Sequence, residues 1–144
     1  MKLTKIEALK YCVEMWDILA HSRYRKKQVH REKITACQEL VVKYNLYYPE
    51  NECFMCEYVK QQNKMGKVGL DCNLCPMKDV WKTDIVYVDD FEESRLAKNC
   101  FCENSYDSPY RDWMEEWEKP ALRRFAKAIA DGAREMLQRE EENA

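Results

Sequence analysis

The first third of the chain carries apolar residues at the three- and four-residue spacing of amphipathic helices. In residues 3–20 these positions are Ile6, Leu9, Val13 and Trp16, and in residues 29–45 they are Ile34, Cys37, Val41 and Tyr44. Thr4, followed three residues later by Glu7, has the pattern of a capping box at a helix start. The sequence therefore predicts an antiparallel helical hairpin over residues 1–46, with the tyrosines that precede Pro49 at the edge of the core.

The last third of the chain predicts further helices, over residues 109–138. Ser108 followed by Pro109 is typical of a helix N-cap and first helical position, and Pro120 is expected to kink or restart the helix. The apolar positions here also have helical spacing: Trp113, Trp117, Leu122, Phe125, Ile129 and Met136. We expect these side chains to lie in the core.

The middle of the chain, residues 47–108, lacks this helical pattern over most of its length. Only residues 85–88 resemble a strand, so we expect a short β-hairpin at most. The 144 residues include only three glycines and four prolines, with 46% hydrophobic and 35% charged side chains, which is typical of a folded, helix-rich protein. We predict a mainly α fold in a single domain, residues 1–144, and no membrane span, because no apolar run is long enough.

Eight cysteines change this picture, because four of them form two C-x-x-C pairs within the loop region. The pairs are Cys53 with Cys56 and Cys72 with Cys75, separated by fifteen residues. Two such turns can present four thiolates at the corners of a tetrahedron, which is the arrangement that structural Zn²⁺ prefers. We therefore predict a closed Zn²⁺ site that contributes folding energy and has no open position for a substrate.

The remaining cysteines are assigned less directly. Cys100 and Cys102 lie two residues apart, where an extended chain points their sulfurs to opposite faces, so one of them is an additional candidate ligand and simple packing is the alternative. Cys12, alone on the first predicted helix, is expected to be a small buried hydrophobe.

The segment between the first two predicted helices is basic. Residues 21–33 carry six Lys or Arg and one Glu, within a chain of net charge −2. A phosphate-binding surface would use Arg23, Arg25, Lys26, Lys27 and Arg31, with Tyr24 stacking on a base or sugar. The alternative is a solvated turn between two helices.

The order of the motifs resembles that of a recurring group of small, cysteine-rich, zinc-binding proteins of bacteriophages. The pattern is a first C-x-x-C, a second C-x-x-C followed by Pro76 and Met77, and a later cysteine, here Cys102, before Pro109 and Tyr110. In that group the later cysteine directly precedes the Pro-Tyr pair, whereas here the two are further apart. The resemblance covers about residues 53–110 and implies a phage protein in the host cytoplasm, without a particular activity.

Enzyme interpretations fit the sequence poorly. A zinc deaminase would use His30 and Glu32 with Cys53 and Cys56, but no proline directly precedes Cys53 and no α/β pattern surrounds these residues. A C-x-x-C redox enzyme lacks its βαβ context, and an HNH-type nuclease lacks histidines after His30.

We therefore expect no catalytic residues and a function in binding, in a reducing cytoplasm. The expected partner is a host protein, which the chain binds or inhibits as a phage accessory factor. A nucleic-acid-binding module using residues 23–33 is the alternative. The oligomeric state does not follow from the sequence.

Overall fold

The structure is a computed structural model, and it describes residues 2–25, 28–62, 75–77, 109–116 and 118–143. The described helices are α1 (Lys5–Ala20), α2 (Val29–Tyr44), α3 (Phe54–Gln62), α5 (Pro109–Glu115) and α6 (Lys119–Glu142), and a short 3₁₀ turn, η1 (Glu50–Glu52), precedes α3. No strand occurs among these residues, which confirms the mainly α fold. The predicted strand at residues 85–88 lies outside the described residues.

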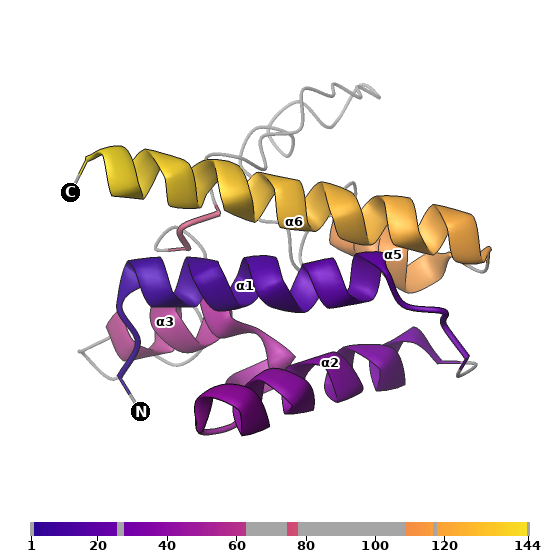
Figure 1. Cartoon of the computed structure of the whole chain (residues 1–144), viewed down its shortest axis with the longest axis horizontal. Coiled ribbons are helices and arrows are strands. Elements are labelled where there is room, and N and C mark those ends of the chain that lie inside the picture. Colours follow the sequence, from indigo (N-terminus) through magenta and orange to yellow (C-terminus); the bar gives the residue numbers. More distant parts are fainter. Residues whose placement is uncertain (1, 26–27, 63–74, 78–108, 117, 144) are drawn as a thin grey trace, which may run out of the picture.

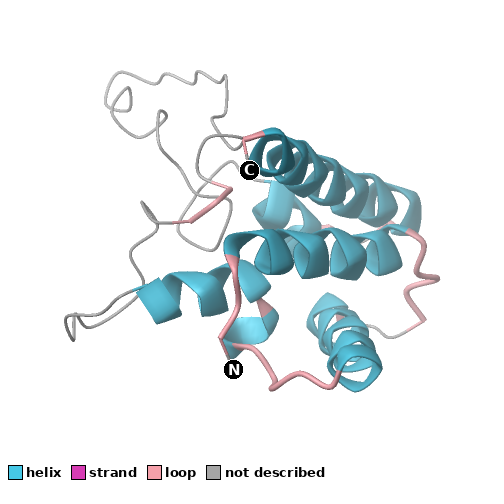
Figure 2. Cartoon of the chain, turned by 60° about the vertical axis from the view of Figure 1, so that its left-hand side comes forward, coloured by secondary structure: helices cyan, strands magenta, loops and turns pink. Residues whose placement is uncertain are grey.

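Helix α1 lies at the centre of the arrangement (Figures 1 and 2). It begins with the predicted capping box: the Glu7 N–H donates to Thr4 Oγ1 at 3.1 Å, and the Thr4 N–H donates to Glu7 Oε1 at 3.0 Å. Since these bonds satisfy two N–H groups that a helix start leaves without partners, the cap fixes where α1 begins.

Helix α2 runs antiparallel to α1, which confirms the predicted hairpin (Figure 1). Ser22 donates a hydrogen bond to Glu32 near the loop, while Lys43, close to the other end of α2, forms an ion pair with Glu14 of α1. The helix ends at Asn45, which adopts left-handed backbone angles of φ 53° and ψ 54°. Asparagine tolerates this conformation better than most residues, so it stops α2 four residues before Pro49.

Helix α6 lies along α1 in the opposite direction (Figures 1 and 2). Lys5 pairs with Glu140 at 2.7 Å near one end, and Arg123 donates to the Ser22 carbonyl at 3.4 Å near the other. Pro120 lies in the first turn of α6, where a proline N–H would have no helical partner, so it restarts a helix instead of kinking one. The helix continues to Glu142, beyond the predicted end at residue 138, with a pair between Arg139 and Glu135 four residues apart.

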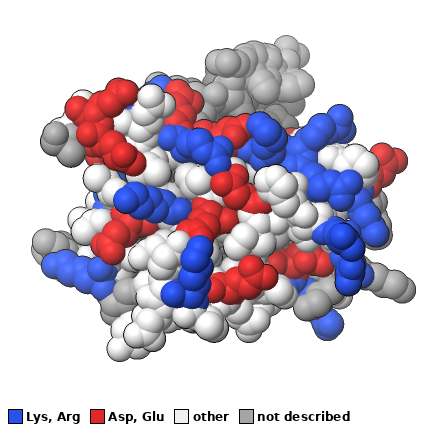
Figure 3. All heavy atoms as spheres, viewed as in Figure 1, with Lys and Arg blue, Asp and Glu red and all other residues white. Residues whose placement is uncertain are grey.

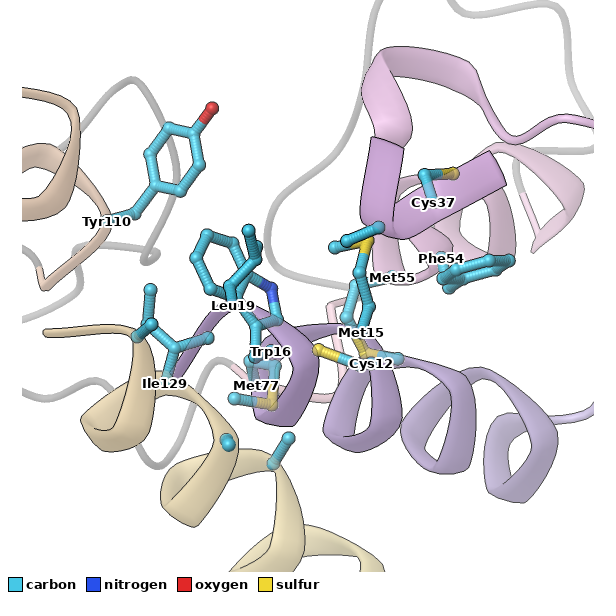
Figure 4. Close-up of a cluster of buried hydrophobic side chains, with 14 of the residues drawn as sticks. Cys12, Met15, Trp16, Leu19, Cys37, Phe54, Met55, Met77, Tyr110 and Ile129 are labelled. Carbon is cyan, nitrogen blue, oxygen red and sulfur yellow. The ribbon is translucent and has the colours of Figure 1, made fainter. Parts of the chain in front are cut away.

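One cluster of buried side chains joins these helices (Figure 4). It contains Leu9, Trp16 and Leu19 of α1 together with Ile129 of α6 and Trp113 of α5, as the apolar spacing predicts. Trp117, the other predicted core tryptophan, lies outside the described residues.

Candidate functional site

The first C-x-x-C pair lies at the start of α3. The Cys56 N–H donates to Cys53 Sγ at 3.2 Å, and the Glu57 N–H donates to the Cys53 carbonyl at 3.0 Å. Cys53 therefore occupies the position of an N-cap, with its sulfur accepting a backbone hydrogen bond as a serine oxygen would. Because N–H donors and the positive end of a helix favour negative charge, this position suits a thiolate.

The backbone that leads into Cys53 is tightly turned. Asn51, with φ 57°, and Glu52, with φ 50°, are consecutive residues in the left-handed region. This conformation is unfavourable for residues with a Cβ atom, and more so for Glu than for Asn. Glu52 also faces His30, with 3.4 Å between His30 Nε2 and Glu52 Oε1. The approach to the first cysteine is thus held in a strained conformation.

The structure brings one cysteine from each pair toward Cys12. Cys53 and Cys75 both pack against the buried cluster that includes Cys12 of α1. The pKa of the Cys12 thiol is raised well above its ordinary value, first by burial and then by the nearby Cys53 and Cys75. Cys12 is buried, as predicted, but its position beside members of both pairs was not predicted, because nothing in the spacing of an isolated cysteine indicates its neighbours.

The predicted set of four cysteines is only partly described. Cys72 lies outside the described residues, as do the additional candidates Cys100 and Cys102. Within residues 2–25, 28–62, 75–77, 109–116 and 118–143, no three His, Cys, Asp or Glu residues form a group that could hold a metal ion. The four-cysteine site therefore remains a prediction.

The fifth cysteine among the described residues, Cys37 of α2, is also buried. Burial is the main cause that raises the pKa of its thiol to about 12. Its side chain forms a hydrogen bond with that of Tyr48. Since a thiol with so high a pKa stays protonated near neutral pH, Cys37 is a packing residue at the edge of the site.

A lysine lies beside the first pair. Lys33 of α2 is only 4% exposed, and its Nζ donates to the Asn51 carbonyl at 2.9 Å and to the Tyr110 hydroxyl at 3.2 Å. This residue belongs to the basic segment, for which the sequence predicts either a solvated turn or a phosphate-binding surface. The structure instead places its charge inside the protein, next to the approach to Cys53.

The other residues of the basic segment include both exposed and buried side chains. Arg23, Arg25 and Arg31 are exposed, and Lys26 and Lys27 lie outside the described residues. Tyr24 is 4% exposed, and its hydroxyl accepts a hydrogen bond from Trp113 Nε1 at 2.7 Å. The role that a phosphate-binding surface would give Tyr24, stacking on a base or sugar, is therefore wrong, because the ring is buried against Trp113 of α5 and the backbone has a positive φ of 46°.

The exposed arginines belong to a larger basic surface. Lys and Arg side chains gather at the end of the molecule where α6 begins and the loop between α1 and α2 lies (Figure 3). The described exposed members, here called the basic end, are Arg23, Arg25, Arg31, Lys119, Arg124 and Lys127. The contact between Arg123 and the Ser22 carbonyl joins the two elements that form it.

A second exposed surface lies where α2 ends. Val42 is 82% exposed and Tyr47 is 73% exposed, while Tyr44 and Tyr48 are exposed to smaller extents. We call these four residues the tyrosine patch. The expected position of the tyrosines at the edge of the core is thus wrong for Tyr47. The left-handed turn at Asn45, closed by a hydrogen bond from the Leu46 N–H to the Val41 carbonyl at 3.0 Å, directs the chain away from the core.

Two of the four patch residues, Tyr44 and Tyr48, are held in place by contacts with neighbouring side chains. The Tyr44 hydroxyl donates to Glu14 Oε2 at 2.6 Å, and its ring lies 5.2 Å from that of Tyr11. The Tyr48 side chain forms a hydrogen bond with that of Cys37. Tyr44 and Tyr48 are therefore preorganised, which lowers the entropy cost of ordering them when a partner binds.

Comparison with known proteins found no match to a protein-family model, to a curated protein or to a solved structure. None of the helices that the structure describes has both the length and the apolar character needed to cross a bilayer.

Proposed function

We propose that this protein is a non-catalytic, zinc-stabilised module that binds another protein through the tyrosine patch. The observation that carries the proposal is the exposure of Val42 and Tyr47 at the end of α2, in the same stretch of chain as the anchored Tyr44 and Tyr48. Tyrosine is enriched in protein interfaces because it offers a large contact area at a small loss of conformational entropy. Under the phage resemblance the partner is a host protein, which the chain binds or inhibits in the host cytoplasm.

The zinc part of the proposal is supported by the local geometry of the cysteines. Cys53 has the N-cap position and the N–H donor that stabilise a thiolate, and Cys75, from the second pair, packs against the same buried cluster. Cys53, Cys56, Cys72 and Cys75 would hold the ion, whose binding displaces the thiol protons to solvent. The ion would link α3 to the chain that follows the second pair and so stabilise the loop region.

Site-directed photo-crosslinking tests the patch. A photo-reactive phenylalanine analogue is placed at position 42 or 47, and at the exposed Gln138 near the end of α6 as a control, and the cells are irradiated during infection. We expect one host protein to be crosslinked from both patch positions and not from the control. Equal labelling from all three positions, or no crosslinked product from the patch, would contradict the proposal.

The affinity for the partner identified in this way is then measured with Tyr47→Ala. Truncating an interface tyrosine typically costs about 1–2 kcal/mol or more of binding energy, so we expect at least about fivefold weaker binding by titration calorimetry. The unfolding midpoint should not change, because the Tyr47 ring is in solvent. Val42→Thr, which keeps the shape of the side chain, is the milder matched variant.

Binding of nucleic acid at the basic end is the second candidate function. The observation that favours it is that α6 adds Lys119 and Arg124 to the arginines of the loop. A surface of this kind binds phosphates by displacing counterions, so retention on DNA or RNA should fall steeply between 50 and 200 mM salt, by roughly 10-fold or more for a few contacts.

The test of this second function compares charge removal at the two ends of the molecule. Arg23→Ala combined with Arg25→Ala should abolish retention at low salt, whereas Arg139→Ala near the end of α6 should not affect it. Lack of retention of the unmodified protein at 50 mM salt would rule this function out.

A further inference from the structure

Lys33 is the only buried charged side chain among the residues that the structure describes. Its ammonium group contacts the Asn51 carbonyl and the Tyr110 hydroxyl, and lies 4.8 Å from the centroid of the Tyr110 ring. These partners are polar but carry no formal charge. No carboxylate in the described part of the chain forms an ion pair with Lys33. A buried charge without an opposite charge is strongly destabilising, so its presence needs a reason.

The first cysteine pair begins two residues after Asn51, whose carbonyl the Lys33 ammonium group binds. The contacts of Lys33 Nζ, two donated hydrogen bonds and the face of the Tyr110 ring, are those of a charged ammonium group. Protonated, neutral thiols would give it no counter-charge, whereas thiolates would.

Lys33 also holds the strained approach to the site. Its Nζ binds the carbonyl of Asn51, the first of the two consecutive left-handed residues that precede Cys53. Backbone strain of this kind persists only where surrounding contacts fix it, and it often occurs at functional sites. The hydrogen bond from Lys33 is such a contact, and it lies two residues from the cysteine that caps α3.

From these two observations we propose that Lys33 is the positioning residue and buried counter-charge of a metal–thiolate centre that contains Cys53 and Cys56. The inference rests on the zinc site proposed above and adds a residue to it. Several thiolates around one divalent ion leave the centre with net negative charge, and the buried ammonium group stabilises that charge. The same group sets the backbone angle at which Cys53 enters α3.

The test is the affinity for Zn²⁺, and for Co²⁺ as a coloured substitute, measured by competition with a chromophoric chelator at fixed pH. Lys33→Met removes the charge and nearly keeps the volume, and Lys33→Gln also keeps a donor for the Asn51 carbonyl. Both should bind each metal about 10–100-fold more weakly, as is typical when an outer contact of a metal ligand is lost. Lys43→Met is the matched control on α2, since Lys43 is exposed and pairs with Glu14, and its affinity should equal that of the unmodified protein.

The possible results separate the two proposals. If the unmodified protein binds neither metal, the zinc site is wrong. If it binds metal and a folded Lys33→Met or Lys33→Gln variant binds equally tightly, the zinc site stands and the role of Lys33 is wrong. For a variant that is unfolded without metal, the readout is the zinc concentration that restores the helical circular dichroism signal. That concentration should be at least tenfold higher than for the metal-free unmodified protein, and an equal concentration would overturn the role of Lys33.

Discussion

At the scale of single residues, two polar side chains of the basic segment are drawn into the interior, Tyr24 and Lys33. The Tyr24 hydroxyl serves as the acceptor for Trp113 Nε1, and Trp113 is fully buried. A buried N–H without an acceptor destabilises the folded state by about 1–3 kcal/mol. Tyr24 and Lys33 therefore contribute to the protein interior, although the sequence alone placed them in a segment with the composition of a binding surface.

Tyr24→Phe should lower the free energy of unfolding by about 1–3 kcal/mol, because the Trp113 N–H then loses its acceptor. Urea unfolding followed by tryptophan fluorescence measures this change. Tyr47→Phe is the control, since that hydroxyl is in solvent, and it should have an effect within about 0.5 kcal/mol. Equal effects of the two substitutions would contradict the burial of the Tyr24 hydroxyl.

The Tyr24 hydroxyl also predicts how the free energy of unfolding depends on pH. Burial is the main cause that raises the pKa of Tyr24 from about 10 to about 12, so the folded state favours the neutral phenol. The resulting stabilisation is fully present below pH 10 and is lost as the pH rises from 10 through 12. The difference in unfolding free energy between the unmodified protein and Tyr24→Phe should therefore shrink over this range. A constant difference from pH 8 to 12 would contradict the assignment.

At the scale of elements, α1 and α6 form the main packing surface. The buried face of α6 is built largely from small residues: Ala121, Ala126, Ala130, Gly132 and Ala133. Small side chains let two helices approach closely, and α1 contributes large residues to the contact, including Leu9, Met15 and Trp16. The close contact between these two helices depends on keeping the α6 face small.

Ala130→Leu should destabilise the protein by about 1–3 kcal/mol, because the added atoms must displace α1 or adopt strained rotamers. Ala128→Leu makes the same substitution on the exposed side of α6, where the change should stay within about 0.5 kcal/mol. Chemical denaturation of both variants provides the comparison. A larger loss for Ala128→Leu than for Ala130→Leu would mean that the buried face of α6 is wrongly assigned.

Helix positions could be predicted from the sequence because they depend on neighbours three and four residues away. The second helix was predicted over residues 29–45 and is observed at Val29–Tyr44, and Thr4 and Glu7 form the predicted cap. The surroundings of Cys12 and Lys33 could not be predicted, because their contacts join residues far apart in the chain. Lys33 and Tyr110, for example, are 77 positions apart. The burial of Tyr24 depends on a positive φ that no residue type in the segment requires.

At the scale of the whole molecule, a helical core carries two separate exposed surfaces. The basic end lies where α6 begins, and the tyrosine patch lies at the C-terminal end of α2, whose other end is near the basic end (Figures 1 and 3). The proposed zinc site lies beside the core at α3, where Cys53 follows Tyr48 of the patch by five residues. Tyr47→Ala changes only an exposed side chain, whereas removal of zinc would act on the loop region, so the two changes should have different effects.

The cysteines should differ sharply in their effect on metal content. Cys56→Ser should abolish zinc binding and unfold the loop region, because a structural site of four cysteines contributes on the order of 10 kcal/mol. Cys37→Ser should keep the metal, because Cys37 is a packing residue whose thiol stays protonated. Metal analysis of the purified variants by mass spectrometry distinguishes these results. Loss of zinc from Cys37→Ser together with its retention by Cys56→Ser would reverse the assignment.

The most direct test of the whole account is the metal content of the unmodified protein together with its fold. Native mass spectrometry of protein purified without chelator should show one zinc ion per chain, and stripping the ion should lower the thermal unfolding midpoint by roughly 10 °C or more. A protein that is free of metal as purified, takes up no zinc, and is nevertheless fully folded would contradict the zinc-stabilised module proposed here.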